Sequence, residues 1–356
     1  MDCIKNFSSD GESNPITKGT IEFSKFRKFE LIQQMRAADD IPHTEMLNQM
    51  RQPIRGNPRI NNNYIESIKT LDHNDFQNDP TFLLTPIVVT SNKERHLINT
   101  IRSKHWANAR KIQRIIWKYP LQGRLASIIP TNLHQYLYKT IQSINGCFVP
   151  GIPGYITENI DPRIKISNGS PVILHSLTLN SRENYNNIIQ RLEESQEDII
   201  LEFPPTHIHV KLPKANPNDF IVKSLIENEV IIPIPISERS TMHKVSFPGR
   251  TDQLEIKFKT HPIELGFAIT VHKVQGQTCD RLILDLNKRP FRPNINFHGL
   301  YVALSGVKLG SNLRILPLHH NNNNLNYLQN LKPSEHLTEW LEAFNNNGYW
   351  SARSSN

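Results

Sequence analysis

The chain has 356 residues, which is enough to bury a large core and favours two domains. Apolar residues make up 37% of it, the mean hydropathy is −0.47, and no apolar run approaches the roughly 20 residues that cross a bilayer. These values argue against a membrane protein, while the net charge of +8 and the pI near 9.3 favour a polyanionic partner.

The N-terminal segment carries no targeting pattern. Residues 1–22 are rich in Ser, Asn, Gly and acidic residues, which predicts an unstructured lead-in. They lack the apolar stretch of a signal peptide and the Arg-rich, acid-poor composition of a transit peptide. We therefore expect an intracellular protein of the nucleus or cytoplasm, with the mitochondrion left open.

The cysteines and the paired histidines form no recognisable metal motif. The three cysteines are far apart, which favours reduced thiols over a disulfide framework. Two histidine pairs have no carboxylate or thiol company nearby in the sequence, so we expect no metal site. The residues in question are Cys3, Cys147, Cys279, His207, His209, His319 and His320.

The first half of the chain predicts alternating strands and helices. A short strand is expected near Phe23 and a helix over about 42–52. A strand over about 82–90 then leads to a helix that Ser91 caps, with Glu94 completing a capping box. Strand, cap and helix in this order form one unit of a doubly wound sheet. Three apolar residues fall on one face of that helix: Leu97, Ile98 and Ile101.

The middle of the chain predicts a small β-rich region. A β-like run over 112–121 and a helix over 132–144 precede it. From residue 145 short apolar or alternating runs are separated by Pro, Gly, Asn and acidic clusters, which is typical of a small sheet or barrel. One acidic, helix-prone excursion interrupts it at 184–198.

The segment 266–286, GFAITVHKVQGQTCDRLILDL, predicts a strand, a polar turn and a second strand. The turn crowds together hydroxyls, amides, two basic side chains and a glycine. Such a set suits phosphate groups, because Lys273 supplies a point charge and Gly276 lets backbone N–H groups approach closely. The polar members are Thr270, His272, Lys273, Gln275, Gln277 and Thr278.

Two strings in this region carry a family resemblance. AITVHKVQGQT at 268–278, followed by LYVALSGVKLGSNLRIL at 300–316, resembles the fifth and sixth motifs of superfamily-one DNA helicases of the PIF and RecD-like group. A segment around Arg36 is similar to their fourth motif. The resemblance covers residues 23–345 and implies ATP-dependent DNA unwinding for full-length relatives.

The resemblance also implies an α/β fold, a RecA-like lobe with a parallel sheet and an inserted Src-homology-3-like β-barrel. Beyond the sixth motif, an asparagine-rich loop and a helix from Ser334 are expected. The expected divisions are 1–22 as lead-in, 23–144 as the first part of the lobe, 145–260 as the barrel, 261–318 as the rest of the lobe, and 319–356 as loop and helix.

Site roles follow from the same resemblance. Arg36 is expected at the terminal phosphate of ATP, and Gln275 and Gly276 near the nucleotide. Arg51, which ends a second Gln-Met-Arg triplet, is a competing candidate that a helix surface also explains. The residues expected at the nucleic acid are Thr270, His272, Lys273 and Thr278, with weaker candidates at Arg163, Lys165, Lys211 and Lys214.

The parts that hydrolyse ATP are not readable in this chain. A phosphate-binding loop ends in Gly-Lys-Ser or Gly-Lys-Thr and an acidic motif holds Mg²⁺, yet the sequence has no Gly-Lys pair and no Asp-Glu pair. In the sixth motif Gly306 stands where relatives have an arginine. ATP and Mg²⁺ are therefore expected for full-length relatives and not for productive binding by this chain alone.

Two interpretations stay open. The chain is either the C-terminal half of a 5′-to-3′ DNA helicase whose first motor lobe lies elsewhere, or a non-catalytic single-strand-binding module or relic derived from one. In both, the expected partner is single-stranded DNA, with RNA not excluded, and no membrane is involved.

Overall fold

The computed structural model describes residues 22–23, 25–29, 36–51, 60–123, 126, 129–164, 166–194, 197–213, 229–246, 253–288, 293–318, 325–335, 338, 342–345 and 347–350. The chain divides into two compact units. The central unit is His73–Lys273, and the flanking unit combines Met1–Asp72 with Val274–Asn356. The five divisions expected from the sequence follow the family resemblance and not compactness, and they stay a prediction.

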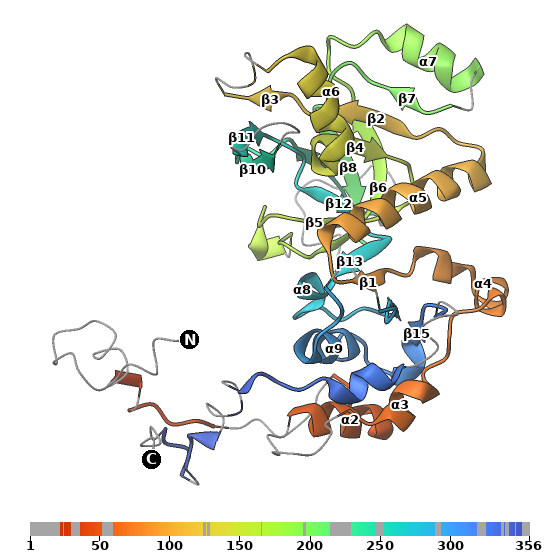
Figure 1. The fold of residues 1–356 in the computed structure, drawn as a ribbon. Helices are drawn as coiled ribbons and strands as arrows, with labels where there is room; N and C mark the ends of the chain where they lie inside the picture. Colours follow the sequence, from red (N-terminus) through yellow and green to blue (C-terminus); the bar gives the residue numbers. More distant parts are fainter. Residues whose placement is uncertain are drawn as a thin grey trace. The chain divides into compact units, whose positions relative to one another are not determined.

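The central unit contains a parallel strand pair and a long helix (Figure 1). Strand β1 (Ile87–Val89) pairs in parallel with β13 (Ala268–Thr270), and every residue of both strands is buried. Helix α5 (Asn92–Arg110) contacts both strands. Side chains buried on both faces suit a parallel pair that is covered by a helix.

The N-terminus of α5 is capped as expected. The helix does not bury the face that carries its apolar side chains. Ser91 Oγ accepts a 3.2 Å hydrogen bond from the Glu94 backbone N–H. Leu97 and Ile101 are 50% and 45% exposed, so the apolar stripe faces away from the core. Asn99 replaces it: its Nδ2 donates to Leu265 O at 2.8 Å, and its Oδ1 accepts from Ala268 N at 2.9 Å.

The strand expected over 82–90 is wrong in its first half. Residues Pro80–Leu84 form a 3₁₀ helix, η2, and the strand begins only at Ile87. Asp79 accounts for the difference, because its Oδ1 accepts a 3.0 Å hydrogen bond from the Thr81 N–H. An Asp cap followed by Pro at the first helical position stabilises a helical turn.

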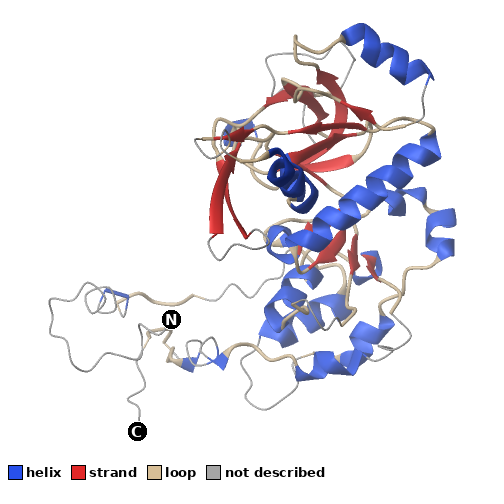
Figure 2. Ribbon diagram, turned by 45° about the horizontal axis from the view of Figure 1, so that its top comes forward, coloured by secondary structure: helices blue, strands red, loops and turns tan. Residues whose placement is uncertain are grey.

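The middle of the chain is β-rich, as the sequence predicts, and its strands pair mostly antiparallel (Figure 2). Their burial alternates along the chain, the pattern of a sheet with one buried face. Five strands form one sheet in the order β12 (Ile263–Leu265), β5 (Pro153–Ile156), β6 (Pro171–Thr178), β8 (His207–Lys211) and β9 (Ile231–Pro235).

Two three-stranded sheets and several short helices complete the central unit. The sheets are β10 (Thr241–Ser246), β11 (Gln253–Phe258) and β3 (Leu121–Gln122), and β4 (Asn145–Phe148), β2 (Ile115–Lys118) and β7 (Ile199–Ile200). The helices are α4 (His73–Asn78), α6 (Thr131–Thr140), η3 (Gln142–Ile144), η4 (Pro162–Ile164) and α7 (Tyr185–Glu194). The helices predicted over 132–144 and within 184–198 are thereby confirmed.

The flanking unit contains a second parallel strand pair. Strand β14 (Leu282–Leu284) pairs with β15 (Leu313–Ile315), and helix α2 (Ile41–Arg51) contacts α9 (Phe297–Leu304). The helix predicted over 42–52 is confirmed. Other helical segments described in the flanking unit are α3 (Asn62–Ser67), η6 (Gly310–Asn312) and η8 (Leu325–Asn330). Helix α8 (Val271–Val274) joins the two units in sequence.

Some expectations fall where the structure gives no description. Nearly all of the lead-in, the asparagine run at 321–324 and half of the helix expected after Ser334 lie outside the described residues. The fold class is confirmed at a coarse level, since the chain is a mixed α/β protein with parallel strand pairs. None of the described helices combines the length and the apolar character that crossing a membrane requires.

Candidate functional site

The polar turn lies directly after a buried parallel strand. Strand β13 ends at Thr270, which is 7% exposed, and the single helical turn α8 follows it. Gly276 then adopts φ +80°, and the space around its Cα is open. A left-handed conformation of this kind favours glycine. His272, Gln275 and Thr278 are exposed, so most of the turn is available to a ligand.

Lys273 is held in an ion cluster that the sequence did not predict. Its ammonium binds the Glu264 carboxylate, and Arg95 Nη1 lies 2.9 Å from the same Glu264 Oε2. The Arg95 side chain is 7% exposed, whereas those of Lys273 and Glu264 are each 28% exposed. Two cations share one carboxylate, so the three side chains together carry one positive charge, and Lys273 is the more exposed of the two cations.

The electrostatics of the cluster extend to the next residue of α5. Burial, assisted by the Arg95 cation, lowers the pKa of His96 to about 4. His96 is therefore neutral near pH 7. The positive charge at this side of the central unit comes from lysine and arginine and does not depend on histidine protonation.

Arg36 contacts the segment that resembles the sixth motif, and its expected role at the terminal phosphate of ATP stays a prediction. Its Nη1 donates a 2.7 Å hydrogen bond to the Ser305 carbonyl oxygen. The turn after α8 reaches the same backbone, because Cys279 N donates to Gly306 O at 2.8 Å. The flanking unit thus brings Arg36, Gly306 and the segment that follows Gln275 and Gly276 into one place.

Gly306 is required by packing. A Cβ atom at this position would lie 2.7 Å from Val274 Cγ1 and 2.8 Å from Leu282 Cδ1. Both neighbours are buried, at 1% and 0% exposure, so the position has no room for a longer side chain. Lys308, two residues later, is exposed. Val274 and Leu282 therefore leave no space at position 306 for the arginine that the resemblance expects there.

The alternative arginine occupies a surface position. Arg51 is exposed at the end of α2, and its Nε donates a 2.6 Å hydrogen bond to Tyr301 Oη of α9. Its guanidinium also lies 5.6 Å from the Tyr301 ring centroid. These contacts agree with the helix-surface interpretation of Arg51.

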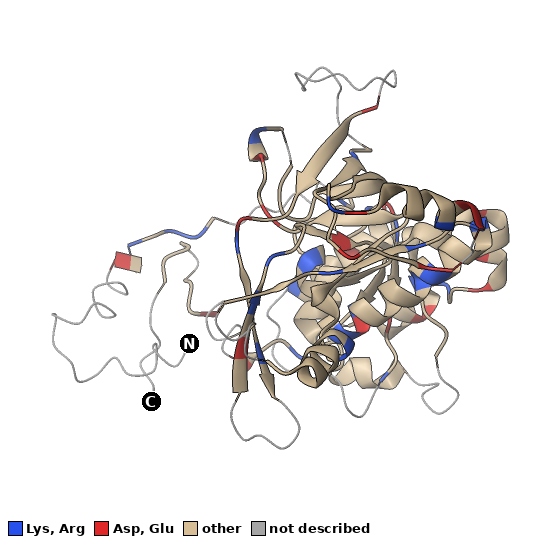
Figure 3. Cartoon of the chain, turned by 90° about the horizontal axis from the view of Figure 1, so that it is seen from above, with Lys and Arg blue, Asp and Glu red and all other residues tan. Residues whose placement is uncertain are grey.

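The weaker basic candidates are paired or undescribed. Arg163 forms an exposed ion pair with Asp161 at 2.9 Å, and Lys211 binds Glu229. Lys165 and Lys214 lie outside the described residues. Figure 3 shows basic and acidic residues interspersed along the chain, so the net charge does not single out one element.

The structure gives no support to a metal centre. Within the described ranges, no group of three or more His, Cys, Asp or Glu side chains could hold a metal ion. The His207 and His209 rings lie 6.5 Å apart, and His319 and His320 fall among the undescribed residues.

Sequence comparison and structure comparison differ in what they reveal. No protein-family model and no curated protein matches the chain. Among solved structures, Pif1 helicase from Bacteroides in complex with ADP-AlF3 and ssDNA matches with a TM-score of 0.52 and 16% identity, over 92% of this chain and 59% of that one. Pif1 helicase from Candida albicans matches with a TM-score of 0.49 and 15% identity, over 87% and 59%.

The fold expected from the fourth, fifth and sixth motifs is thus confirmed as similar to that of Pif1 helicases. The chain spans about 59% of the length of the two structures compared. At 16% identity the similarity concerns the fold.

Proposed function

We propose that this chain binds single-stranded DNA through the turn that follows β13, as the second lobe of a PIF-like helicase. The observation that carries the proposal is the exposed turn at the end of a buried parallel strand, with Lys273 as the more exposed cation of an ion cluster that carries one surplus positive charge. A phosphodiester backbone is the polyanion that such a turn suits. Thr270, His272 and Thr278 supply the hydroxyl and imidazole contacts. RNA remains a second ligand of the same chemistry.

The finer description of the fold belongs to this proposal. We assign the two parallel strand pairs to a RecA-like lobe and the five-stranded antiparallel sheet to an inserted Src-homology-3-like barrel. The similarity to the Bacteroides Pif1 structure supports this assignment, because it extends over 92% of the chain and so includes the antiparallel region.

Nucleotide contacts form the second part of the proposal. Arg36, Gln275 and Gly276 are the proposed nucleotide contacts, and the hydrogen bond from Arg36 to Ser305 supports a site at this part of the flanking unit. ATP hydrolysis and 5′-to-3′ unwinding require a phosphate-binding loop and a Mg²⁺ site, which another segment or a partner chain would supply. We propose that the chain alone hydrolyses no ATP.

A non-catalytic single-strand-binding module is the second candidate function. The packing of Gly306 favours it, because the position of the family arginine is filled by Val274 and Leu282. An arginine that stabilises the transition state of phosphoryl transfer contributes a factor of roughly 10³ or more. A lobe without that group could still bind a strand.

Titration of a labelled single strand with the purified chain, at low and at raised salt, tests the strand-binding function. Binding that weakens steeply with salt supports it, since phosphate contacts release counterions. ATP hydrolysis is measured in the same samples with and without the strand. Binding without hydrolysis agrees with the proposal, strand-stimulated hydrolysis contradicts its second part, and no binding at either salt contradicts its first.

A further inference from the structure

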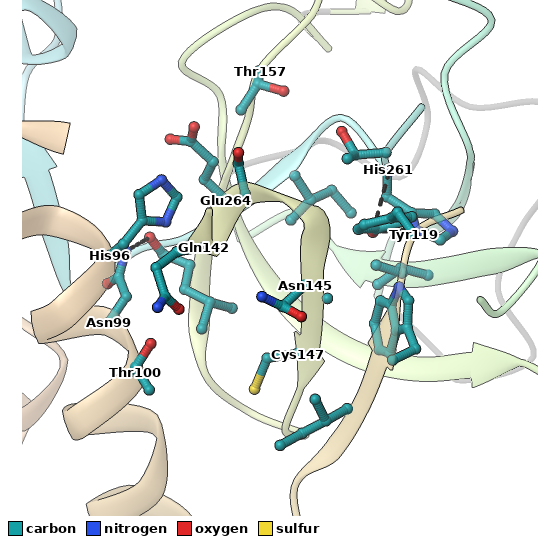
Figure 4. Close-up of a pocket in the computed structure, with 18 of the residues that line it drawn as sticks. His96, Asn99, Thr100, Tyr119, Gln142, Asn145, Cys147, Thr157, His261 and Glu264 are labelled. Atoms are coloured by element: carbon teal, nitrogen blue, oxygen red, sulfur yellow. Dashed lines mark hydrogen bonds between the residues drawn. The ribbon is translucent and has the colours of Figure 1, made fainter. Parts of the chain in front are cut away.

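The central unit contains a cavity of about 540 Å³ that the proposed function does not use. Its walls come from α5, β2, β4, η3 and β12 (Figure 4). Cavities of about 300–1,000 Å³ are the usual size for binding small organic groups. The polar and aromatic lining residues used below are His96, Tyr119, Gln142, Asn145, His261 and Glu264.

The charges in the cavity lining cancel. Its ionic side chains are Arg95, Arg114, Glu158 and Glu264, two cations and two carboxylates. Arg95 pairs with Glu264 at 2.9 Å, and Arg114 pairs with Asp198 at 2.6 Å behind the wall. A neutral lining disfavours a lone phosphate or a metal ion and favours an uncharged polar ligand.

One end of the cavity is a neutral aromatic wall. The His261 backbone N–H donates to Tyr119 Oη at 3.3 Å, and the Tyr119 hydroxyl lies 2.8 Å from His261 Nδ1, to which it donates. Burial lowers the pKa of His261 to about 4 and raises that of Tyr119, so both are uncharged at pH 7. Trp117 packs edge-on against both rings. Planar heterocycles stack on such walls.

The other side offers hydrogen-bonding atoms of fixed character. Arg95 has only donors and its Nη2 lies 3.2 Å from His96 Nε2, so Nε2 accepts and the proton is on Nδ1. Asn145 Nδ2 donates to the carbonyl oxygens of Tyr138 at 2.8 Å and Ile141 at 3.3 Å, which leaves Oδ1 as an acceptor.

Gln142 adds an exposed amide between His96 and Asn145 (Figure 4). Neither this amide, nor His96 Nδ1, nor Asn145 Oδ1 has a hydrogen bond to the part of the chain that the structure describes.

We propose that this cavity takes an unstacked nucleobase of the single strand whose phosphates bind at Lys273, an inference that rests on the proposed function. Neutral donors and acceptors beside an aromatic wall match the polar edge and flat face of a base. Glu264 connects the two sites, because it lines the cavity and binds the Lys273 ammonium. A base carried by a free nucleotide has the same chemistry and is a second source.

Two labelled oligonucleotides of equal length and charge test the inference with the full chain, one of thymidines and one with abasic sites in place of every base. Wild-type protein is expected to bind the thymidine strand at least about fivefold more tightly. Gln142→Leu should reduce this preference about threefold while leaving the affinity for the abasic strand unchanged. Gln190→Leu, on α7 and outside the lining, is the matched control and keeps the preference.

A second variant, Ser143→Phe, fills the cavity from η3 and should also reduce the preference; thermal melting confirms that each variant is folded. Equal affinity of wild-type protein for both strands overturns the inference while leaving strand binding intact. An unchanged preference in both folded variants also overturns it. Failure to bind either strand overturns the proposed function itself. Displacement of the thymidine strand by thymidine monophosphate assigns the cavity to bases of either source, and no displacement assigns it to the strand.

Discussion

The Arg36 guanidinium donates a 2.7 Å hydrogen bond to the carbonyl oxygen of Ser305, the residue that precedes Gly306. The two partners are 269 positions apart in the sequence, so the contact depends on the tertiary fold of the flanking unit. The contact places Arg36, which the resemblance assigns to the nucleotide, beside Gly306, the position at which the resemblance expects another arginine.

Removal of this contact should weaken the flanking unit. Arg36→Ala is expected to lower the free energy of unfolding by about 1–2 kcal/mol, because a hydrogen bond from a charged donor to a half-buried carbonyl is lost. Urea denaturation measures the change. Arg51→Ala, at an exposed position on α2, is the control and should cost less. A loss for Arg36→Ala no larger than that of the control would contradict the account.

The ion cluster at Lys273 should depend on its shared carboxylate. Glu264→Gln leaves the 7% exposed Arg95 side chain without its counter-charge, and we expect a loss of about 3 kcal/mol in the free energy of unfolding. Asp161→Asn is a matched control, since its partner Arg163 is 88% exposed, and it should leave the stability unchanged. Similar urea midpoints for the two variants would show that the cluster contributes no more than a surface pair.

Restoring the family arginine should not restore hydrolysis. Gly306→Arg forces a side chain against Val274 and Leu282, and overpacking of this kind costs about 1–3 kcal/mol. We expect a lower melting temperature and no ATP turnover. Lys308→Arg places the same group at an exposed position two residues later and serves as the control for stability. A Gly306→Arg variant that melts with the wild type would contradict the packing argument.

Stability should fall with acid because of a buried histidine. Burial lowers the pKa of His261 from 6.5 to about 4, so below pH 6.5 the unfolded chain binds a proton that the folded chain does not. The free energy of unfolding is therefore highest above pH 6.5 and decreases as the pH falls toward 4. One such group accounts for about 3 kcal/mol.

Urea denaturation above pH 6.5 and near pH 4 measures this loss. His261→Asn should be less stable at neutral pH and show a shallower pH dependence than wild-type protein. His105→Asn, at an exposed position of α5, is the control and should keep the wild-type profile. If the free energy of unfolding changed equally with pH in wild-type protein and in His261→Asn, the prediction would be contradicted.

Local features of the fold could be predicted from the sequence. Ser91 and Glu94 identify the start of α5, the apolar spacing identifies α6, and helix-prone composition identifies α7, because caps, periodicity and helix propensity act over a few residues. The buried face of α5 could not be predicted this way. Asn99 is buried there because it bonds the backbone at Leu265 and Ala268, and no local pattern indicates a contact so far along the chain.

The candidate site shows the same limit. The motif strings locate Lys273 and Gly276, and Gly276 has the backbone conformation that its residue type suggests. The motif strings do not include Arg95, although it is the buried member of the ion cluster. Its partner Glu264 follows no motif, and only the three-dimensional fold brings the two together.

The salt dependence of single-strand binding by wild-type protein and by Lys273→Gln, measured side by side with Lys139→Gln as an exposed control, tests the central claim most directly. If Lys273 contacts a phosphate, its replacement should weaken binding and reduce the slope of log affinity against log salt by about 0.7. The Lys139→Gln control should keep both the affinity and the slope of wild-type protein. Identical affinity and slope for Lys273→Gln and wild-type protein, or no strand binding by either, would contradict the claim that the turn after β13 holds a nucleic-acid backbone.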